Sequence, residues 1–304
     1  MQLKTVFLGT SAAVPSSARG LSSVAIVRGN EVLIFDAGEG MQRNFLASGI
    51  GTNRKTKIFI THMHSDHVVG LLGLLQTMAL SNRDMPMQLF GPEVLRDFLE
   101  TNMKLLNFDF TFPVSFSAVS EGIVLNEPDY VVKAKSSEHL VKSYCYCIEE
   151  RERPGVFYPD KAKKLGIPEG GLWHKLQHGE QVEFNGRIIK SEEVTGPKRK
   201  GRKIGISGDT RPNDELADFF SDCDLLIFES TYGEDHKDKA AEHLHSTAKE
   251  AAELAVKARV KKLVLTHFSA RYDDVSVLAK EASEVHPNVT AAEDLMTVEI
   301  PYEE

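Results

Sequence analysis

The chain has 304 residues, of which 41% are hydrophobic and 26% are charged, a balance typical of a globular protein with a large core. No apolar run reaches the roughly 20 residues that a membrane span needs, and the N-terminus lacks a signal-peptide core. We therefore expect a cytoplasmic protein without a membrane segment. Lys and Arg number 36 against 44 Asp and Glu, and the net charge of -8 argues against a surface coated with positive charge for general nucleic-acid binding.

The first half of the chain alternates short apolar runs, separated by Gly, Asn or Pro, with segments of helical periodicity. This alternation predicts a mixed sheet covered by helices. In chain order, we predict strands at 3–8, 22–27 and 32–35, a helix at 39–47, a strand at 57–60, a helix at 68–79, a strand at 88–90, a helix at 93–105, and strands at 130–134 and 143–148.

The character of the sequence changes between residues 151 and 178, where Pro and Gly interrupt every long periodic element. Basic residues outnumber acidic ones in this segment. A long irregular insertion in a compact domain usually has a function, so we predict a protruding flexible arm, with plain disorder as the alternative.

Strands and helices return in the last third of the chain, in an order similar to that of the first half. This similarity predicts an α/β fold in which two mixed sheets pack face to face with helices outside, within a single domain spanning residues 1–304. The predicted elements are 203–206, 214–220, 224–228, a helix at 247–258, 262–265 and 275–285.

Four metal-ligand side chains occur within six residues at the end of a predicted strand: His62, His64, Asp66 and His67. Imidazole and carboxylate groups suit zinc and related divalent ions, and a loop at a strand end can aim alternate side chains into one cleft. A single histidine here would most often be structural, whereas four donors at this spacing favour a metal site.

Further donors must come from distant strand ends, because a catalytic metal needs several protein ligands. His139, Asp209 and His267 each follow a predicted strand. Each residue alone can equally be a loop cap or a turn residue, but their shared position after strands favours all three as ligands.

Several segments together resemble the metallo-β-lactamase superfamily and, within it, the short form of ribonuclease Z, a family of tRNA 3′-processing endonucleases. Besides the histidine-rich turn, the resemblance rests on Phe7-Leu8-Gly9-Thr10, Phe35-Asp36-Ala37-Gly38-Glu39-Gly40, Ser207-Gly208-Asp209-Thr210-Arg211, His245-Ser246-Thr247 and Leu265-Thr266-His267-Phe268-Ser269-Ala270-Arg271-Tyr272. It implies the αββα sandwich of that superfamily, and an endoribonuclease that removes the 3′ trailer from precursor tRNA.

The resemblance also implies two Zn²⁺ ions per subunit and a homodimer. One ion would be held by His62, His64 and His139, the other by Asp66, His67 and His267, with Asp209 bridging them. Hydrolysis by activated water would leave a 3′-hydroxyl on the tRNA and a 5′-phosphate on the trailer.

Three further roles are expected near the metals. Asp66 resembles the family's proton acceptor, with a plain ligand as the alternative. His245 precedes the capping-box pattern Thr247 to Glu250, so we expect it near a helix N-terminus, where it stabilises the transition state or protonates the leaving group, oriented by Glu229. A packing role is the alternative for His245. Asp36 is expected to orient a ligating histidine rather than bind metal.

A dense basic run precedes Asp209, and Arg271 follows His267 closely, so we expect phosphate contacts from Lys198, Arg199, Lys200, Arg202 and Arg271. The arm at 151–178 resembles the family's exosite, which grips the tRNA body. Two alternatives stay open: a small-molecule metallo-hydrolase of the same fold, such as a thioesterase or lactonase, and an inactive RNA-binding scaffold.

Overall fold

The computed structural model describes residues 1–302, which divide into two compact units. The sheet unit comprises Met1–Glu127, Val131–Ile148 and Lys203–Pro301. The arm unit comprises Pro128–Tyr130 and Glu149–Arg202, together with Tyr302. The sequence predicted one domain with an inserted arm, and within the arm unit residues between 162 and 194 enclose a core of their own.

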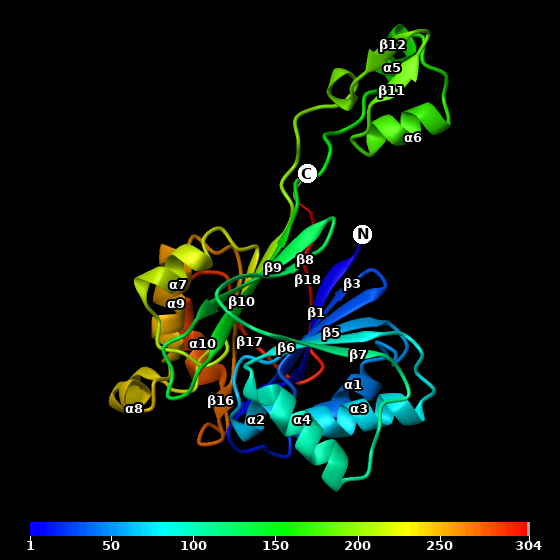
Figure 1. Ribbon diagram of the computed structural model, residues 1–304. Helices are drawn as coiled ribbons and strands as arrows, with labels where there is room; N and C mark the ends of the chain where they lie inside the picture. Colours follow the sequence, from blue (N-terminus) through cyan, green and yellow to red (C-terminus); the bar gives the residue numbers. More distant parts are fainter. Residues whose placement is uncertain (303–304) are drawn as a thin grey trace. The chain divides into compact units, whose positions relative to one another are not determined.

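Seven strands form the first sheet of the sheet unit (Figure 1). β1, β3, β4 and β18 are antiparallel neighbours, whereas β4 through β7 run parallel. Apolar side chains of α1, α3 and α4 join the core of this sheet, including Phe45, Leu74 and Leu95. The order is β18 (Thr297–Glu299), β1 (Leu3–Gly9), β3 (Ser23–Arg28), β4 (Glu31–Phe35), β5 (Lys55–Phe59), β6 (Met87–Gly91) and β7 (Val114–Ala118), with helices α1 (Met41–Ala47), α3 (Gly70–Leu80) and α4 (Val94–Leu105).

Seven further strands form the second sheet, whose core includes the apolar faces of α7, α9 and α10. Its parallel strands β13, β14, β15 and β17 end at one edge, which gathers the loops that follow them. The order is β17 (Val289–Ala291), β15 (Leu263–Thr266), β14 (Leu225–Glu229), β13 (Lys203–Ile206), β10 (Tyr144–Glu150), β9 (Tyr130–Ser136) and β8 (Gly122–Asn126), with helices α7 (Asp214–Phe219), α9 (Ala248–Lys257) and α10 (Ser276–Ser283).

Aromatic rings join the two sheets. Phe59 stacks on Phe35 and on Phe90, with ring centroids 5.0 and 4.7 Å apart, and Tyr146 of β10 meets Phe59 edge-on at 5.5 Å. The Tyr146 hydroxyl donates a 2.9 Å hydrogen bond to the carbonyl of Ile60. The predicted face-to-face packing of two mixed sheets with helices outside is therefore confirmed.

The arm unit has a small core of seven buried side chains: Ala162, Ile167, Trp173, Leu176, Val182, Ile189 and Val194. They come from α5 (Pro159–Lys164), α6 (Gly171–Gln177) and the loop between them, from the hairpin of β11 (Val182–Phe184) and β12 (Arg187–Ile189), and from the segment after it. The unit extends to Arg202, beyond the predicted end of the arm at residue 178, because the hairpin packs on the same core.

Short elements complete the described chain: β2 (Ser11–Ala12) paired with β16 (Phe268–Ser269), α2 (Ser65–Val68), α8 (Lys237–Glu242), and the 3₁₀ turns Ser191–Glu193 and Glu234–His236. Within residues 1–302, every helix is too short or too polar to cross a lipid bilayer.

Candidate metal and active site

The histidine-rich turn leaves β5 and enters α2, as the sequence predicted. His62 is fully buried, and His64 is the last residue before α2 begins at Ser65. Asp66 and His67 lie in the first turn of this short helix and are also buried. The change from extended to helical backbone directs His62 and His64 into one group of donors and Asp66 and His67 into another.

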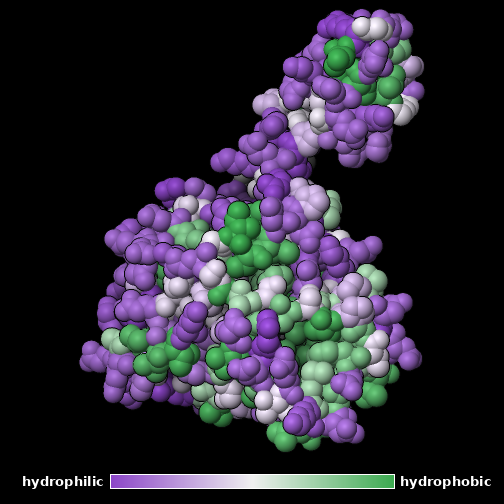
Figure 2. All heavy atoms as spheres, in the orientation of Figure 1, coloured by the Kyte–Doolittle hydropathy of each residue, from purple (hydrophilic) through white to green (hydrophobic). Residues whose placement is uncertain are grey.

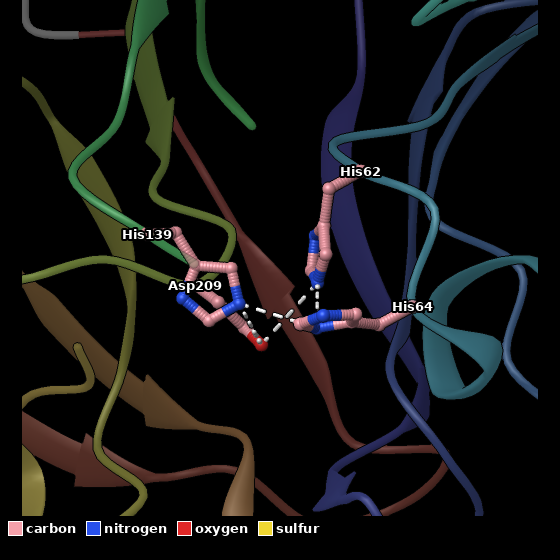
Figure 3. Close-up of side chains that lie close together, drawn as sticks. All are labelled: His62, His64, His139 and Asp209. Carbon is pink, nitrogen blue, oxygen red and sulfur yellow. Dashed lines mark hydrogen bonds and ion pairs between the residues drawn. The ribbon is translucent and has the colours of Figure 1, made fainter. Parts of the chain in front are cut away.

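His139 and Asp209 join the first two histidines in one group of donors. His64 Nδ1 lies 3.1 Å from His62 Nε2 and 3.2 Å from His139 Nε2. Asp209 Oδ2 lies 3.6 Å from His62 Nε2 and 3.9 Å from His139 Nε2. Figure 3 shows the four side chains pointing toward one another, His62 and His64 from the histidine-rich turn and His139 and Asp209 from two other segments. These donors can together hold one metal ion.

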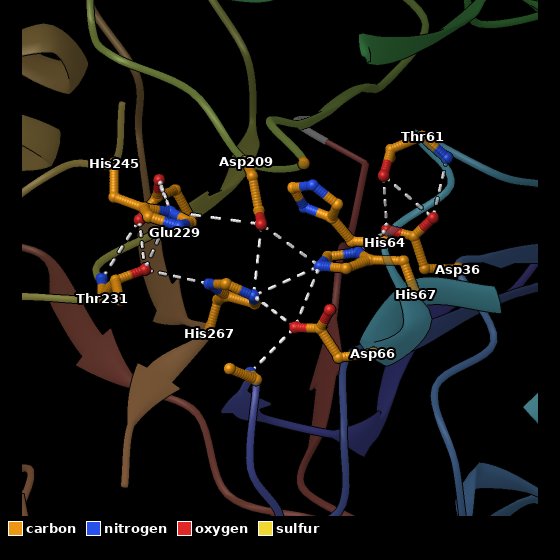
Figure 4. Close-up of polar contacts among 12 residues, drawn as sticks. Asp36, Thr61, His64, Asp66, His67, Asp209, Glu229, Thr231, His245 and His267 are labelled. Carbon is orange, nitrogen blue, oxygen red and sulfur yellow. Dashed lines mark hydrogen bonds and ion pairs between the residues drawn. The ribbon is translucent and has the colours of Figure 1, made fainter. Parts of the chain in front are cut away.

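Asp66, His67 and His267 form a second group that can hold a metal ion (Figure 4). The Nε2 atoms of His67 and His267 lie 3.2 Å apart. Asp66 Oδ2 lies 3.6 Å from the first of these nitrogens and 3.4 Å from the second. The Asp66 carboxylate also accepts a 2.8 Å hydrogen bond from the backbone N–H of Ala13, which fixes its direction.

Asp209 faces both groups. Its Oδ2, which lies 3.6 Å from His62 Nε2 in the first group, lies 3.3 Å from His67 Nε2 in the second, and its Oδ1 lies 3.3 Å from His267 Nε2. Within residues 1–302, Oδ1 is buried without a hydrogen-bond partner. Burial alone would raise the pKa of this carboxyl group, but His267 and His67 outweigh burial and hold it well below its ordinary value. An ionised, buried and under-bonded carboxylate is suited to bind a cation.

In four histidines Nδ1, the ring nitrogen that faces away from the donor groups, already has a polar partner. Each Nε2 is therefore left to face the donor groups. This arrangement fixes the tautomer that a metal ligand requires. The Nδ1 contacts are His62 with Thr61 Oγ1 at 2.9 Å, His67 with Asp36 Oδ2 at 2.7 Å, His139 with the Leu244 carbonyl at 3.2 Å, and His267 with Thr231 Oγ1 at 2.9 Å.

Asp36 contacts the ligand candidate His67 and does not belong to either donor group. Besides His67, it accepts hydrogen bonds from the backbone N–H of Thr61 at 2.7 Å and from its hydroxyl at 2.8 Å. Asp36 and His267 both have positive φ values, 59° and 60°. Such backbone is uncommon for residues other than glycine and gathers at functional sites.

His245 lies against Glu229, as the sequence predicted, with Nδ1 2.8 Å from the Glu229 carboxylate. Burial would lower the pKa of His245, but the attraction of Glu229 outweighs it and raises this pKa to about 9. Glu229 is buried and also accepts hydrogen bonds from the backbone N–H groups of Thr210, Thr231 and Ser246. It is therefore a fixed anionic support for His245.

Thr231 links this support to the second donor group, a role that the sequence alone does not reveal. Its hydroxyl donates to Glu229 at 2.7 Å and lies 2.9 Å from His267 Nδ1. The sequence places Thr231 just after the end of β14. It does not place Thr231 beside His267, because that contact arises only from the pairing of β14 with β15.

The capping box after His245 is confirmed. Thr247 Oγ1 accepts from the backbone N–H of Glu250 at 3.1 Å, and the Glu250 carboxylate accepts from Thr247 N at 3.0 Å. Arg211 adds a contact that the sequence did not predict, because its guanidinium pairs with Glu250 and donates to the carbonyl of His245 at 2.6 Å. The start of α9 thereby fixes the backbone of His245.

The predicted RNA-contacting residues differ in their surroundings. Lys198 and Lys200 are exposed in the arm unit, Arg199 beside them is half-buried, and Arg271 is exposed in the sheet unit. Arg202 is 4% exposed, and its guanidinium binds the Glu150 carboxylate in a bidentate pair at 2.8 and 2.9 Å. We therefore withdraw Arg202 as a phosphate contact, since a buried and paired guanidinium offers no edge to RNA.

The two packed sheets and the donor groups at their strand ends define a hydrolase of the metallo-β-lactamase fold. Residues 174–268 match the β-lactamase superfamily domain, and residues 3–106 match a family model described as anti-Pycsar protein Apyc1. The ribonuclease Z of Nitrosopumilus maritimus is 49% identical over 298 residues, covering 98% of this chain and 100% of that protein. The chain therefore belongs to the ribonuclease Z family and is an endoribonuclease.

Two further relatives agree. The ribonuclease Z of Bacillus subtilis is 39% identical over 305 residues, covering 98% of this chain and 99% of that protein. The crystal structure of human tRNase Z, short form, has a TM-score of 0.73 and 31% identity, covering 98% of this chain and 99% of that one. The small-molecule hydrolase and the inactive scaffold are therefore set aside.

Proposed function

We propose that this endoribonuclease removes the 3′ trailer from precursor tRNA and uses two metal ions. The observation that carries the proposal is the position of Asp209, whose Oδ2 lies near His62 of the first donor group and near His67 of the second, while Oδ1 lies near His267 of the second. The names of the relatives, ribonuclease Z and tRNase Z, support precursor tRNA as the substrate.

The donor set suits zinc, because zinc is commonly bound by imidazole nitrogens and carboxylate oxygens. His62, His64 and His139 would hold one ion, Asp66, His67 and His267 the second, and Asp209 both. When bound, two such ions supply a water of lowered pKa and neutralise the charge of the phosphate. The under-bonded Oδ1 of Asp209 fits this assignment, since a buried carboxylate oxygen needs a partner.

Asp66 and His245 would move the protons of the reaction. Burial would raise the pKa of Asp66, but His267 and His67 hold it below its ordinary value, so it is ionised at neutral pH and can accept a proton from the attacking water. His245, with a pKa raised to about 9, is protonated and can donate to the departing 3′-oxygen. The bond from phosphorus to that oxygen breaks, so the tRNA keeps a 3′-hydroxyl and the trailer keeps a 5′-phosphate.

Mapping both product ends from a 3′-extended precursor tRNA tests this chemistry. We expect a 3′-hydroxyl on the tRNA and a 5′-phosphate on the trailer, with two zinc ions per chain by elemental analysis. A 2′,3′-cyclic phosphate would contradict the mechanism, because it requires the RNA 2′-hydroxyl as the nucleophile.

The arm unit would bind the body of the tRNA through its backbone. Lys198 and Lys200 are exposed there, and Arg199 lies between them. Arg271 would contact the RNA from the sheet unit, where its guanidinium lies over the Tyr232 ring at 4.8 Å. Replacing residues 154–198 with a short Gly-Ser linker should weaken precursor-tRNA binding and spare hydrolysis of bis(p-nitrophenyl) phosphate, which reports on the metal site alone.

A homodimer and a cytoplasmic location complete the proposal. Figure 2 shows hydrophobic side chains on the surface of the sheet unit, near α3 and α4. At these helices Leu80 is 80% exposed, Val94 58%, Leu105 76% and Leu106 58%, more apolar surface than single exposed residues explain. Sedimentation should give a dimer for the parent and a monomer for Leu105→Glu.

A further inference from the structure

The two ends of the arm meet around the ring of Tyr302. The chain enters the arm unit at Glu149 and leaves it at Arg202. We propose that Tyr302 is a positioning residue for precursor-tRNA processing, because its ring joins Arg153 near the entry to Arg202 at the exit. This inference rests on the proposed function, in which the arm unit binds tRNA.

Both guanidinium groups lie unusually close to the ring. The guanidinium carbon of Arg153 is 3.3 Å from the ring centroid of Tyr302, and that of Arg202 is 3.7 Å away. Cation–π contacts extend to about 6 Å, and carbon atoms touch at roughly 3.5–4 Å. A guanidinium at this distance must lie almost directly over the ring, so the two groups occupy opposite faces.

Arg202 is held rigidly on its far side. Its guanidinium donates two hydrogen bonds to the Glu150 carboxylate, and both side chains are only 3% exposed. The backbone N–H of Glu150 also donates to the carbonyl of Arg202 at 2.9 Å. A buried bidentate pair is strong and directional, so Arg202 presents a fixed surface to the ring.

Arg153 depends more on the ring. Its backbone exchanges two hydrogen bonds with Arg199, at 2.8 and 2.9 Å, which sets the two chain directions side by side. Within residues 1–302, the Arg153 Nε atom is buried without a hydrogen-bond partner. The ring face of Tyr302 therefore covers the guanidinium of this half-buried side chain.

Removing the ring would leave two guanidinium groups facing each other across a gap. Their repulsion and the exposure of the Glu150 pair to water would loosen the entry and exit of the arm unit. The RNA-binding surface would then be less ordered before tRNA arrives, and binding would have to order it. The metal donors lie in the other unit and should not be affected.

The test compares Tyr302→Ala with Tyr302→Phe, which keeps the ring and removes only the hydroxyl. With precursor tRNA, Tyr302→Ala should raise KM by about 3- to 30-fold and leave kcat within about twofold, as expected for the loss of two cation–π contacts. Tyr302→Phe should behave like the parent. Bis(p-nitrophenyl) phosphate hydrolysis should be unchanged in both variants, which also shows that they fold.

Two further measurements make the outcome decisive. Hydrogen exchange in Tyr302→Ala should increase at residues 149–153 and 199–202, and Arg153→Gln should raise KM in the same direction by a smaller factor. A parent-like KM for Tyr302→Ala would overturn the inference, and so would an equal loss of activity on both substrates.

The Gly-Ser replacement of residues 154–198 separates this inference from the proposed function. If the replacement leaves KM for precursor tRNA unchanged, the tRNA-binding role of the arm unit is wrong and the role of Tyr302 fails with it. If the replacement raises KM and Tyr302→Ala does not, only the role of Tyr302 is overturned.

Discussion

The donor groups of the sheet unit and the basic surface of the arm unit are organised in opposite ways. His62, His67 and Asp209 are at most 2% exposed, and further hydrogen bonds fix the outer nitrogens of both histidines. Lys198 and Lys200, in contrast, are exposed to solvent. Chemistry at a phosphate needs atoms placed within fractions of an ångström, whereas attraction of a polyanion needs charge that water and salt can reach. The two regions should therefore respond differently to mutation.

Loss of the bridging carboxylate should have the largest effect. Asp209→Ala removes a side chain that faces both donor groups. We therefore expect turnover on both substrates to fall by more than the ~100-fold that can follow the loss of a residue that only orients a metal ligand. Elemental analysis should show a fall in metal content. Asp218→Ala, which changes an exposed aspartate of α7, is the matched control. Retention of two metals and near-parent activity in Asp209→Ala would refute the ligand assignment.

Loss of the charge beside His245 should change the pH dependence of kcat. The pKa of His245 is raised to about 9, so the protonated acid is present below that pH and is lost as the pH rises through it. Glu229→Gln removes the group that raises this pKa and leaves the burial that lowers it. The falling limb of the kcat–pH profile should therefore move to lower pH, with kcat reduced about 10- to 100-fold at neutral pH.

Glu253→Gln serves as the control for this profile, because Glu253 is exposed on α9. An unchanged falling limb in Glu229→Gln would show that His245 does not donate the proton. Binding of precursor tRNA should stay at the parent level, which distinguishes this effect from any change in the arm unit.

The local part of this site could be predicted from the sequence. Four donors lie within six residues after a strand, and β13, β14 and β15 lead directly to Asp209, Glu229 and His267. The role of Thr231 could not be predicted, because it arises only where β14 and β15 pair and bring residues 36 positions apart into contact. The edge strand β18 was also missed, since its pairing with β1 joins opposite ends of the chain.

The arm unit shows a different limit of sequence analysis. Asn185-Gly186 is a strong turn signal, and both residues have positive φ in the hairpin. The strands on either side have three residues each, too few for alternation of polar and apolar residues to appear. Arg202 stood in a run of five basic residues, and only its contacts with Glu150 and Tyr302 reveal that it is structural.

A cavity created in the core of the arm unit should impair the processing of precursor tRNA and spare the hydrolysis of the small phosphodiester. Trp173 is 9% exposed, donates a 3.0 Å hydrogen bond to Ile167 and packs on Phe157, so Trp173→Ala should destabilise this unit by about 3 kcal/mol. KM for precursor tRNA should rise several-fold, whereas bis(p-nitrophenyl) phosphate hydrolysis should not change. Val156→Ala alters an exposed arm side chain and is the control. A loss on both substrates would show that the two units do not act separately.

Substitution of the exposed lysines should have the smallest effect, and the salt dependence of precursor-tRNA binding is the best measure of it. Each phosphate that a lysine neutralises releases counterions, so binding weakens as salt is added. The slope of log K against log salt concentration reflects the number of phosphate contacts. Lys198→Ala and Lys200→Ala should each make the slope of log K against log salt concentration shallower by about one. Lys280→Ala removes an exposed lysine of α10 and should leave the slope unchanged. Catalysis in saturating precursor tRNA should be parent-like in all three variants, because none of these lysines belongs to the donor groups. A slope equal to that of the parent in both arm variants would mean that the basic surface of the arm unit does not contact the tRNA backbone.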